Sequence, residues 1–355
     1  MCPGSGSASA SATPDRLTQV SGHLEKLVLD PNSESFPKYK DLPRYPGEPE
    51  GAAWLWGKDD ELGRLNLLTP ARVLKAKEHI QLGEVIPLNL PLHLPSPPMF
   101  GRASFSHSIH RRSEFSIDDI YTMNPQSGTQ WDGFRHFTHI VSKKFYNGMT
   151  AEEILTPGEK RNGIDAWARK GICASALLLD FKSWADEEGV SLEYFNSGKI
   201  SLEMLEKVGK RQGVDIHKDI PAGCILLVRT GWLVADFALS EEERERIHKG
   251  PQVWGGIEAS QAMAEWMHDS WFAAVASDSP SFEAWPLRKK EEGGEGWLLH
   301  EKLLACWGCP IGELWDLERL AEKCNEVKRW WVCLTSAPGN VVGGVGSAVN
   351  GMAIL

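Results

Sequence analysis

The sequence lacks the features of several protein classes. Its 7 cysteines are an odd number in 355 residues, spread from Cys2 to Cys333, so we expect no disulfide framework and a reducing, cytoplasmic location. No apolar run approaches the roughly 18 residues that a membrane-spanning helix needs. Residues 1–14 are rich in Ser, Ala and Gly and have neither the charged start nor the apolar core of a signal peptide. We predict a disordered tail there.

Positive charge is also scarce. The formal net charge is −10 and no long basic run occurs, which argues against nucleic acid or an anionic membrane as a partner. With 42% hydrophobic and 24% charged residues, the composition is that of an ordinary globular protein. These properties fit a soluble protein that handles a small molecule.

Common catalytic and cofactor motifs are missing as well. Neither G-x-S-x-G nor H-E-x-x-H occurs, and the glycines at 343, 344 and 346 are not followed by a helix, so a dinucleotide site is not expected. Cys306 and Cys309 form one Cys-x-x-Cys pair, but a second pair that could complete a zinc site is absent. We interpret these two as structural thiols and expect no organic cofactor.

The order of elements predicts a single α/β domain. Residues 1–50 are expected to be disordered or to form an arm that wraps the domain or its neighbour, because prolines interrupt residues 15–50, and residues 51–355 form the domain. Short apolar runs typical of buried strands alternate with amphipathic segments, which favours a mixed sheet with helices outside. Expected strands are residues 84–90, 140–145, 174–181, 224–230, 272–277, 331–336 and 351–355. Expected helices are residues 70–83, 201–210, 240–249, 257–268, 298–306 and 314–324.

Residues 126–139 collect more ligand and proton-transfer side chains than any other stretch. On an extended backbone, positions two apart share a side, so Gln130, Asp132 and His136 can converge while Trp131 faces away. The alternative is a polar loop with one hydrogen-bonded histidine. A second pair, His300 and Glu313, could supply the other half of a site, although a lone histidine is more often a surface or core residue.

These residues resemble a known family. The sequence is similar to the cyclase family of metal-dependent hydrolases, which includes kynurenine formamidase and isatin hydrolase and whose hallmark reads His-x-Gly-Thr-His-x-Asp-x-Pro-x-His. The Gly-Thr, Asp132 and His136 match that hallmark, whereas Gln126 and Gln130 replace both earlier histidines and Phe134 replaces the proline. Further blocks of likeness are residues 56–63, 66–70, 146–148, 227–232, 276–280, 300–304 and 310–313.

The resemblance implies a fold, an assembly and site roles. The fold should be a single-domain mixed β-sheet with a barrel-like core and outer helices, assembled as a homo-oligomer, a dimer or a tetramer. By position, Gln126, Gln130 and Asp132 would hold a divalent ion such as Mn or Zn, and His136 would be the base. His300 and Glu313 would bind a second ion or orient the substrate. Since amides are weak ligands, Asp132 and Glu313 with the Gln carbonyls would favour Mn²⁺ or Mg²⁺, with a histidine as nitrogen ligand.

Three functions remain open from the sequence. The leading hypothesis is hydrolysis of a small cyclic amide, formamide or lactone, in which water attacks a carbonyl and His136 accepts its proton. The alternative is a metal-free cyclase or dehydratase that uses acid/base catalysis by Asp132, His136, His300 and Glu313, while the glutamines hydrogen-bond the substrate. A non-catalytic binding protein is the third. In the first two cases, aromatic side chains would line the pocket: Trp131, Phe134, Phe137 and Phe100.

Overall fold

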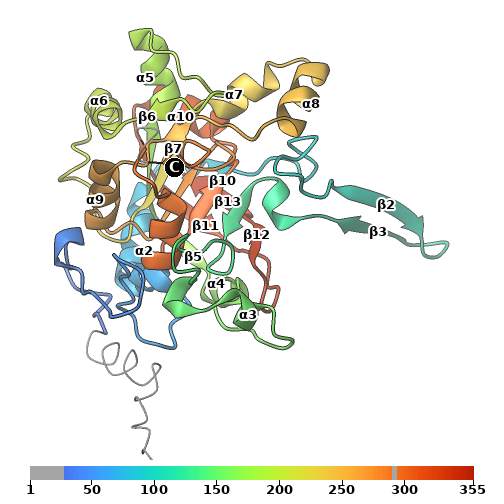
Figure 1. The fold of residues 1–355 in the computed structure, drawn as a ribbon. Coiled ribbons are helices and arrows are strands. Elements are labelled where there is room, and N and C mark those ends of the chain that lie inside the picture. The colour runs from blue at the N-terminus through green and yellow to red at the C-terminus, as the bar shows by residue number, and fades with distance from the viewer. Residues whose placement is uncertain (1–27, 290–293) are drawn as a thin grey trace, which may run out of the picture.

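The computed structural model describes residues 28–289 and 294–355. Figure 1 shows one large sheet with helices around it. The expected disordered tail, residues 1–14, lies outside the described residues. Residues 290–293 also lie outside them. The described residues form a mixed α/β fold, as predicted.

Nine strands form the large sheet in the order β1-β13-β11-β5-β7-β9-β10-β4-β12. Four neighbours, β5, β7, β9 and β10, run parallel, and the other pairings are antiparallel. The strands are β1 (Val85–Pro87), β4 (Gln130–Asp132), β5 (Ile172–Asp180), β7 (Ile225–Arg229), β9 (Ala274–Ser277), β10 (Ile311–Glu313), β11 (Trp331–Ser336), β12 (Gly346–Ala348) and β13 (Gly351–Ile354). Smaller pairs are β2 (Ser106–Arg111) with β3 (Ile117–Thr122) and β6 (Lys199–Ile200) with β8 (Gly256–Ile257).

The sheet curls strongly. β12 is its last strand and β13 its second, yet only Val349 and Asn350 separate them in the sequence. Two residues span at most about 11 Å from strand to strand, whereas nine flat strands would extend over roughly 38 Å. The two ends of the sheet must therefore approach each other, which confirms the barrel-like core.

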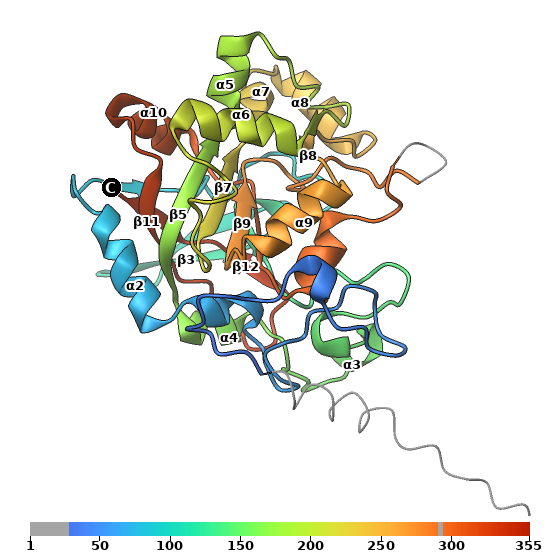
Figure 2. The ribbon, with the colours of Figure 1, turned by 90° about the vertical axis from the view of Figure 1, so that its left-hand side faces the viewer.

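Helices cover the outside of this sheet, with α5, α6, α7, α8 and α9 around its parallel part (Figure 2). The C-terminal half of β5 is buried at every position from residue 176 to 180, and residues 176–179 form a continuous apolar run, as expected of a strand covered on both faces. The α-helices are α2 (Pro70–Ala76), α3 (Ala151–Ile154), α4 (Asp165–Lys170), α5 (Phe181–Glu188), α6 (Leu202–Gln212), α7 (Trp232–Phe237), α8 (Glu241–Lys249), α9 (Gln261–Asp269) and α10 (Glu318–Val327). Short helical turns are η1 (Tyr39–Asp41), η2 (Gly63–Leu67), η3 (Lys77–His79), η4 (Pro125–Ser127), η5 (Tyr146–Gly148) and the π-helix η7 (Glu301–Cys306).

The described part of residues 1–50 lies against the body of the protein. The Leu29 amide donates to the Leu55 carbonyl, and the Tyr39 amide donates to Asp269 over 2.7 Å. The Trp271 indole in turn donates to the Pro37 carbonyl. Among the described residues, no helix is long and apolar enough to cross a membrane.

Several elements differ from the sequence-based expectation. Residues 140–145 form turns with a single bridge between His139 and Lys144, so the strand predicted there is wrong. The helix predicted over residues 70–83 ends at Ala76 and continues only as η3. The β2–β3 hairpin was not expected, because its residues are exposed on both faces and show no apolar alternation.

Candidate functional site

β4 sets the geometry of the candidate site. Alternation along the strand puts Gln130 and Asp132 on one side and Trp131 on the other. β4 lies between β10 and β12, where Gln130 is opposite Glu313 and Asp132 is opposite Gly346. The Gln130 Nε2 donates to Glu313 Oε2. The strand thus brings an amide and two carboxyl groups together in the buried interior.

Gln126 reaches the same side of the sheet from η4, whose first turn is capped by the Asn124 side chain. A Cβ at Gly346 would overlap the Gln126 Nε2, so the absent side chain makes room for the carboxamide. Directly opposite residues of an antiparallel pair point to the same face. Gln126 therefore lies on the same face as Asp132. The two-residue spacing predicts a shared face for Gln130, Asp132 and His136.

His300 is held between three carboxyl groups. Its Nδ1 lies 2.6 Å from Glu283 Oε1, and its Nε2 lies 3.0 Å from Glu313 Oε1 and 3.7 Å from Asp132 Oδ2. Glu283 also accepts the backbone N–H groups of Leu299 and His300, which fixes its orientation. With Nδ1–H directed to Glu283, the Nε2 atom faces Asp132 and Glu313. Glu283 was missed from the sequence because no motif marks it.

The buried charges shift one another's pKa values. Burial opposes a charge on His300, but the neighbouring carboxyl groups of Asp132, Glu283 and Glu313 outweigh it and raise its pKa well above the ordinary value. Burial and the charge of Asp132 raise the pKa of Glu313 to about 7. For Asp132, burial is outweighed by His136 and His300, and its pKa is lowered.

His136 completes this group of ionisable side chains. It follows β4 in a turn closed by its own N–H to the Gly133 carbonyl at 2.9 Å. Its Nε2 lies 3.7 Å from Asp132 Oδ2, and its side chain keeps 23% of its surface exposed while Asp132 has none. Burial lowers the pKa of His136, although Asp132 opposes this, which favours the neutral base. His136 is thus the member of the group that a water or substrate can reach.

Arg102 brings a positive charge to the site. Its guanidinium Nη1 donates to the backbone carbonyl of Gln126, and it lies 4.9 Å from the ring centre of Phe100. The charge of Arg102 is among the causes that lower the pKa values of Asp132 and Glu313. No local pattern marks Arg102 as a site residue, because the whole β2–β3 hairpin separates it from the motif.

The four predicted aromatic residues take different places. Phe137 lies beside the site, with its ring centre 5.2 Å from that of His300. Phe100 contacts Trp254 and Trp285 at 6.3 and 6.0 Å. Trp131 and Phe134 do not line the site as predicted. Strand alternation turns Trp131 into the core.

The core contacts of these two residues are specific. The Trp131 ring contacts Trp315 at 4.8 Å and its indole donates to Ser336. Phe134 packs between Tyr146 and Trp167, with ring centres 4.5 and 4.9 Å away.

Asp132, His300 and Glu313 could hold a metal ion. Each offers one ligand atom, and these atoms all lie within 4.8 Å of one another. Both oxygens of Asp132 and the Oε1 of Gln130 are buried without a hydrogen-bond partner among the described residues. Buried oxygens normally have a partner, and a bound cation would be one. Gln126 instead turns its Nε2 toward Gly346, and an amide nitrogen that keeps its hydrogens binds no metal. The residues therefore fit a divalent ion, with His300 in place of Gln126.

Comparison with known proteins supports the same fold. Residues 34–284 match the family model named Cyclase. The crystal structure of a novel cyclase is similar to this chain, with 27% sequence identity and a TM-score of 0.72. The match covers 84% of this chain and 98% of the chain in that crystal structure. No curated protein matches the sequence.

Two isatin hydrolases share the fold at lower identity. One, bound to the product analogue thioisatinate, is 14% identical, covers 80% of this chain and 95% of its own, and has a TM-score of 0.52. Isatin hydrolase A from Labrenzia aggregata, bound to benzyl benzoate, is 14% identical over 76% and 93% of the two chains, with a TM-score of 0.51.

Proposed function

This chain belongs to the cyclase family, and from that premise we propose that it hydrolyses a small cyclic amide, formamide or lactone. One observation carries the proposal. Asp132, His136, His300 and Glu313 come from different parts of the sequence and meet in one site, with Nε2 to carboxylate distances of 3.0 to 3.7 Å. Such a group can move protons to and from a reacting carbonyl.

The chain's own residues account for the proton transfers. A water oxygen attacks the carbonyl carbon while His136 Nε2 accepts one of its protons, and Asp132 stabilises the resulting imidazolium. The bond from the carbonyl carbon to the leaving nitrogen or oxygen then breaks, and the leaving atom receives that proton from His136. The products are a carboxylic acid and an amine or alcohol.

Positive charge is available for the oxygen that becomes negative in this reaction. His300 is directed toward Asp132 and Glu313 by Glu283, and Arg102 adds a guanidinium at the Gln126 side. Fixed cations and donors of this kind stabilise a developing oxyanion. A divalent ion held by Asp132, Glu313 and a neutral His300, Mn²⁺ or Zn²⁺, would take the place of the positive charge on His300 and supply Lewis-acid polarisation of the carbonyl.

A metal-free cyclase or dehydratase is the second candidate. It is favoured by the hydrogen bonds that already join Gln130 to Glu313 and His300 to both Glu283 and Glu313. In that case the same acids and bases would act on the substrate without a Lewis acid. Elemental analysis of the purified protein separates the two, because stoichiometric Mn or Zn supports hydrolysis and its absence supports the second candidate.

The proposal is tested with a panel of isatins, formanilides and lactones, each assayed with and without added divalent ions. We expect turnover of at least one class by the parent protein and loss of it in His136→Ala. A protein that is inert toward the whole panel under every metal condition would count against hydrolysis.

A further inference from the structure

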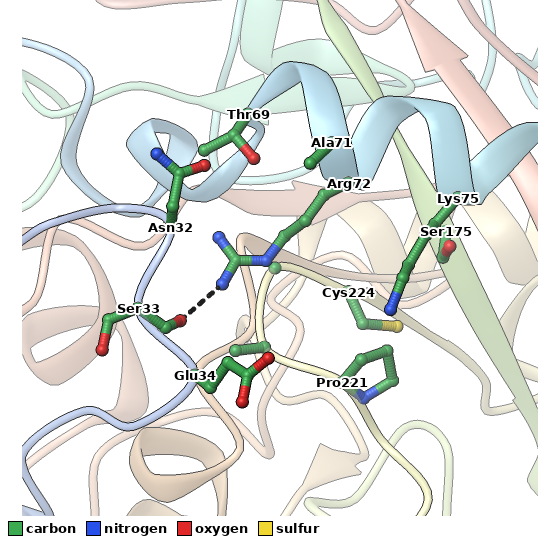
Figure 3. Close-up of a pocket in the computed structure, with 12 residues that line it drawn as sticks. Asn32, Ser33, Glu34, Thr69, Ala71, Arg72, Lys75, Ser175, Pro221 and Cys224 are labelled. Carbon is green, nitrogen blue, oxygen red and sulfur yellow. Dashed lines mark hydrogen bonds between the residues drawn. The ribbon is translucent and has the colours of Figure 1, made fainter.

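A cavity of about 450 Å³ lies away from the ionisable group described above. Its walls come from the segment at residues 32–34, from α2, from the start of β5 and from the turn before β7 (Figure 3). Ser175 and Cys224 stand at the amino ends of the parallel strands β5 and β7, whereas Glu313 is the last residue of the parallel strand β10. The cavity therefore lies at the amino ends of the parallel strands, and the candidate catalytic site lies at their carboxyl ends.

Arg72 holds the two sides of this cavity together. Its guanidinium donates from Nη1 to the carbonyls of Pro31 and Leu67 and from Nη2 to the carbonyl of Ser33, a bond drawn in Figure 3. These bonds fasten the N-terminal segment onto α2. The wall is thus a built part of the fold, in which three of the five N–H donors of Arg72 are used.

Three other polar residues line the cavity without a side-chain partner among the described residues, and of these Thr69 is buried whereas Lys75 and Glu34 are exposed to solvent. The Thr69 hydroxyl is buried, with 5% of the residue exposed, and makes no hydrogen bond to any described residue. Lys75 and Glu34 also line the cavity, and neither makes an ion pair or a side-chain hydrogen bond within the described part of the chain. In Figure 3 the Arg72 guanidinium lies between Thr69 and Glu34, and the Lys75 ammonium lies on the side of Pro221 and Cys224. A buried hydroxyl left without a partner loses a hydrogen bond that a ligand can restore.

The remaining lining is largely apolar and small, with Ala71, Pro221 and Ala222 between the polar groups. A ligand that satisfies all of them needs an anionic end for Lys75, a cationic end for Glu34 and a short apolar body. We propose that this cavity is a second binding site, which takes a small amphoteric molecule carrying a carboxylate and an ammonium group. The proposal does not depend on the reaction at His136.

The test is calorimetric titration of the full-length protein with 6-aminohexanoate, compared with hexanoate and hexylamine, which each lack one charge. We expect saturable 1:1 binding of 6-aminohexanoate and weaker binding of both controls. Lys75→Met and Glu34→Gln should each weaken it about fivefold, the upper range for an exposed ion pair. Thr69→Val should weaken it as well.

Lys77→Met is the matched control, because Lys77 also lies at the end of α2 but does not line the cavity. Thermal unfolding of each variant checks that the fold is retained. The proposal is overturned if 6-aminohexanoate shows no saturable binding, if Lys75→Met and Glu34→Gln bind it as the parent does, or if Lys77→Met weakens it equally. Affinity for hexanoate equal to that for 6-aminohexanoate would also overturn it, since Glu34 would then have no role.

Discussion

At the scale of single residues, His136 is the position on which the proposed chemistry depends most. His136→Ala should lower kcat by about 10²–10⁴-fold, the usual contribution of a general base, because no other histidine lies as close to both Asp132 and solvent among the described residues. The measurement is kcat on the substrate that the panel identifies. His217→Ala is the control, since His217 is an exposed histidine that pairs with Glu206. Turnover within a few-fold of the parent would remove His136 from the mechanism.

The two glutamines distinguish this site from the family hallmark. The double variant Gln126→His, Gln130→His adds two imidazoles beside Asp132 and should bind a divalent ion more tightly. It also removes the hydrogen bond from Gln130 to Glu313. We therefore expect gain of metal together with loss of the native reaction, measured by elemental analysis beside turnover. Gain of both would show that the glutamines are only weakened ligands.

The site was predictable where residues are close in sequence and not where the fold joins distant ones. Alternation along an extended strand correctly places Gln130 and Asp132 together, because the period of two holds in any strand. The same rule places Trp131 on the side of the strand opposite to Gln130 and Asp132. The prediction that Trp131 lines the pocket was therefore inconsistent with that rule. Glu283 and Arg102 reach the site through tertiary contacts that no local pattern reports.

At the scale of elements, the β2–β3 hairpin projects from the body of the protein (Figure 1). Every residue from 106 to 122 is exposed, so the hairpin buries no side chain against the sheet. Replacing residues 106–122 by a short Gly-Ser linker should leave the free energy of unfolding within about 1 kcal/mol of the parent. Urea denaturation followed by tryptophan fluorescence measures this. A large fall in the midpoint would mean that the hairpin stabilises the body.

Exposure also explains which elements the sequence could predict. Buried strands such as β7 and β11 have continuous apolar runs, and α6 and α8 begin at serine caps, so their positions follow from local patterns. The hairpin carries charged and apolar residues without alternation, which gives no such signal. Residues 140–145 have the composition of a strand, but the turn at Asn147 and the bond from the Ile140 amide to Glu301 decide their conformation.

At the scale of the whole molecule, one buried histidine should make stability depend on pH. His268 lies between the rings of Trp271 and Trp307, and burial together with the nearby charge of Arg64 lowers its pKa to about 4, against the effect of Asp269. Below its unfolded pKa of about 6.5 the unfolded chain binds a proton that the folded one does not. Stability is thus lost as pH falls from about 6.5 to about 4, by roughly 3 kcal/mol from this group.

The comparison of parent and His268→Gln isolates that contribution. We expect the free energy of unfolding of the variant to fall less than that of the parent over this pH range. Denaturant titrations at several pH values measure both, and His217→Gln serves as an exposed control. Parallel pH profiles for parent and His268→Gln would show that His268 does not titrate differently in the two states.

The two-residue link at Val349 and Asn350 has a consequence for how the molecule folds. Because β12 and β13 are neighbours in the sequence but join opposite ends of the sheet, the sheet cannot grow strand by strand from one edge to the other. β1 and β4 lie early in the sequence, but β1 pairs with β13 and β4 pairs with β12. Each of the two early strands therefore has an unpaired edge until the last strands of the chain have formed. Pairings of such large sequence separation are slow, and unpaired edges can pair with other chains. Refolding yield should therefore fall steeply as protein concentration rises.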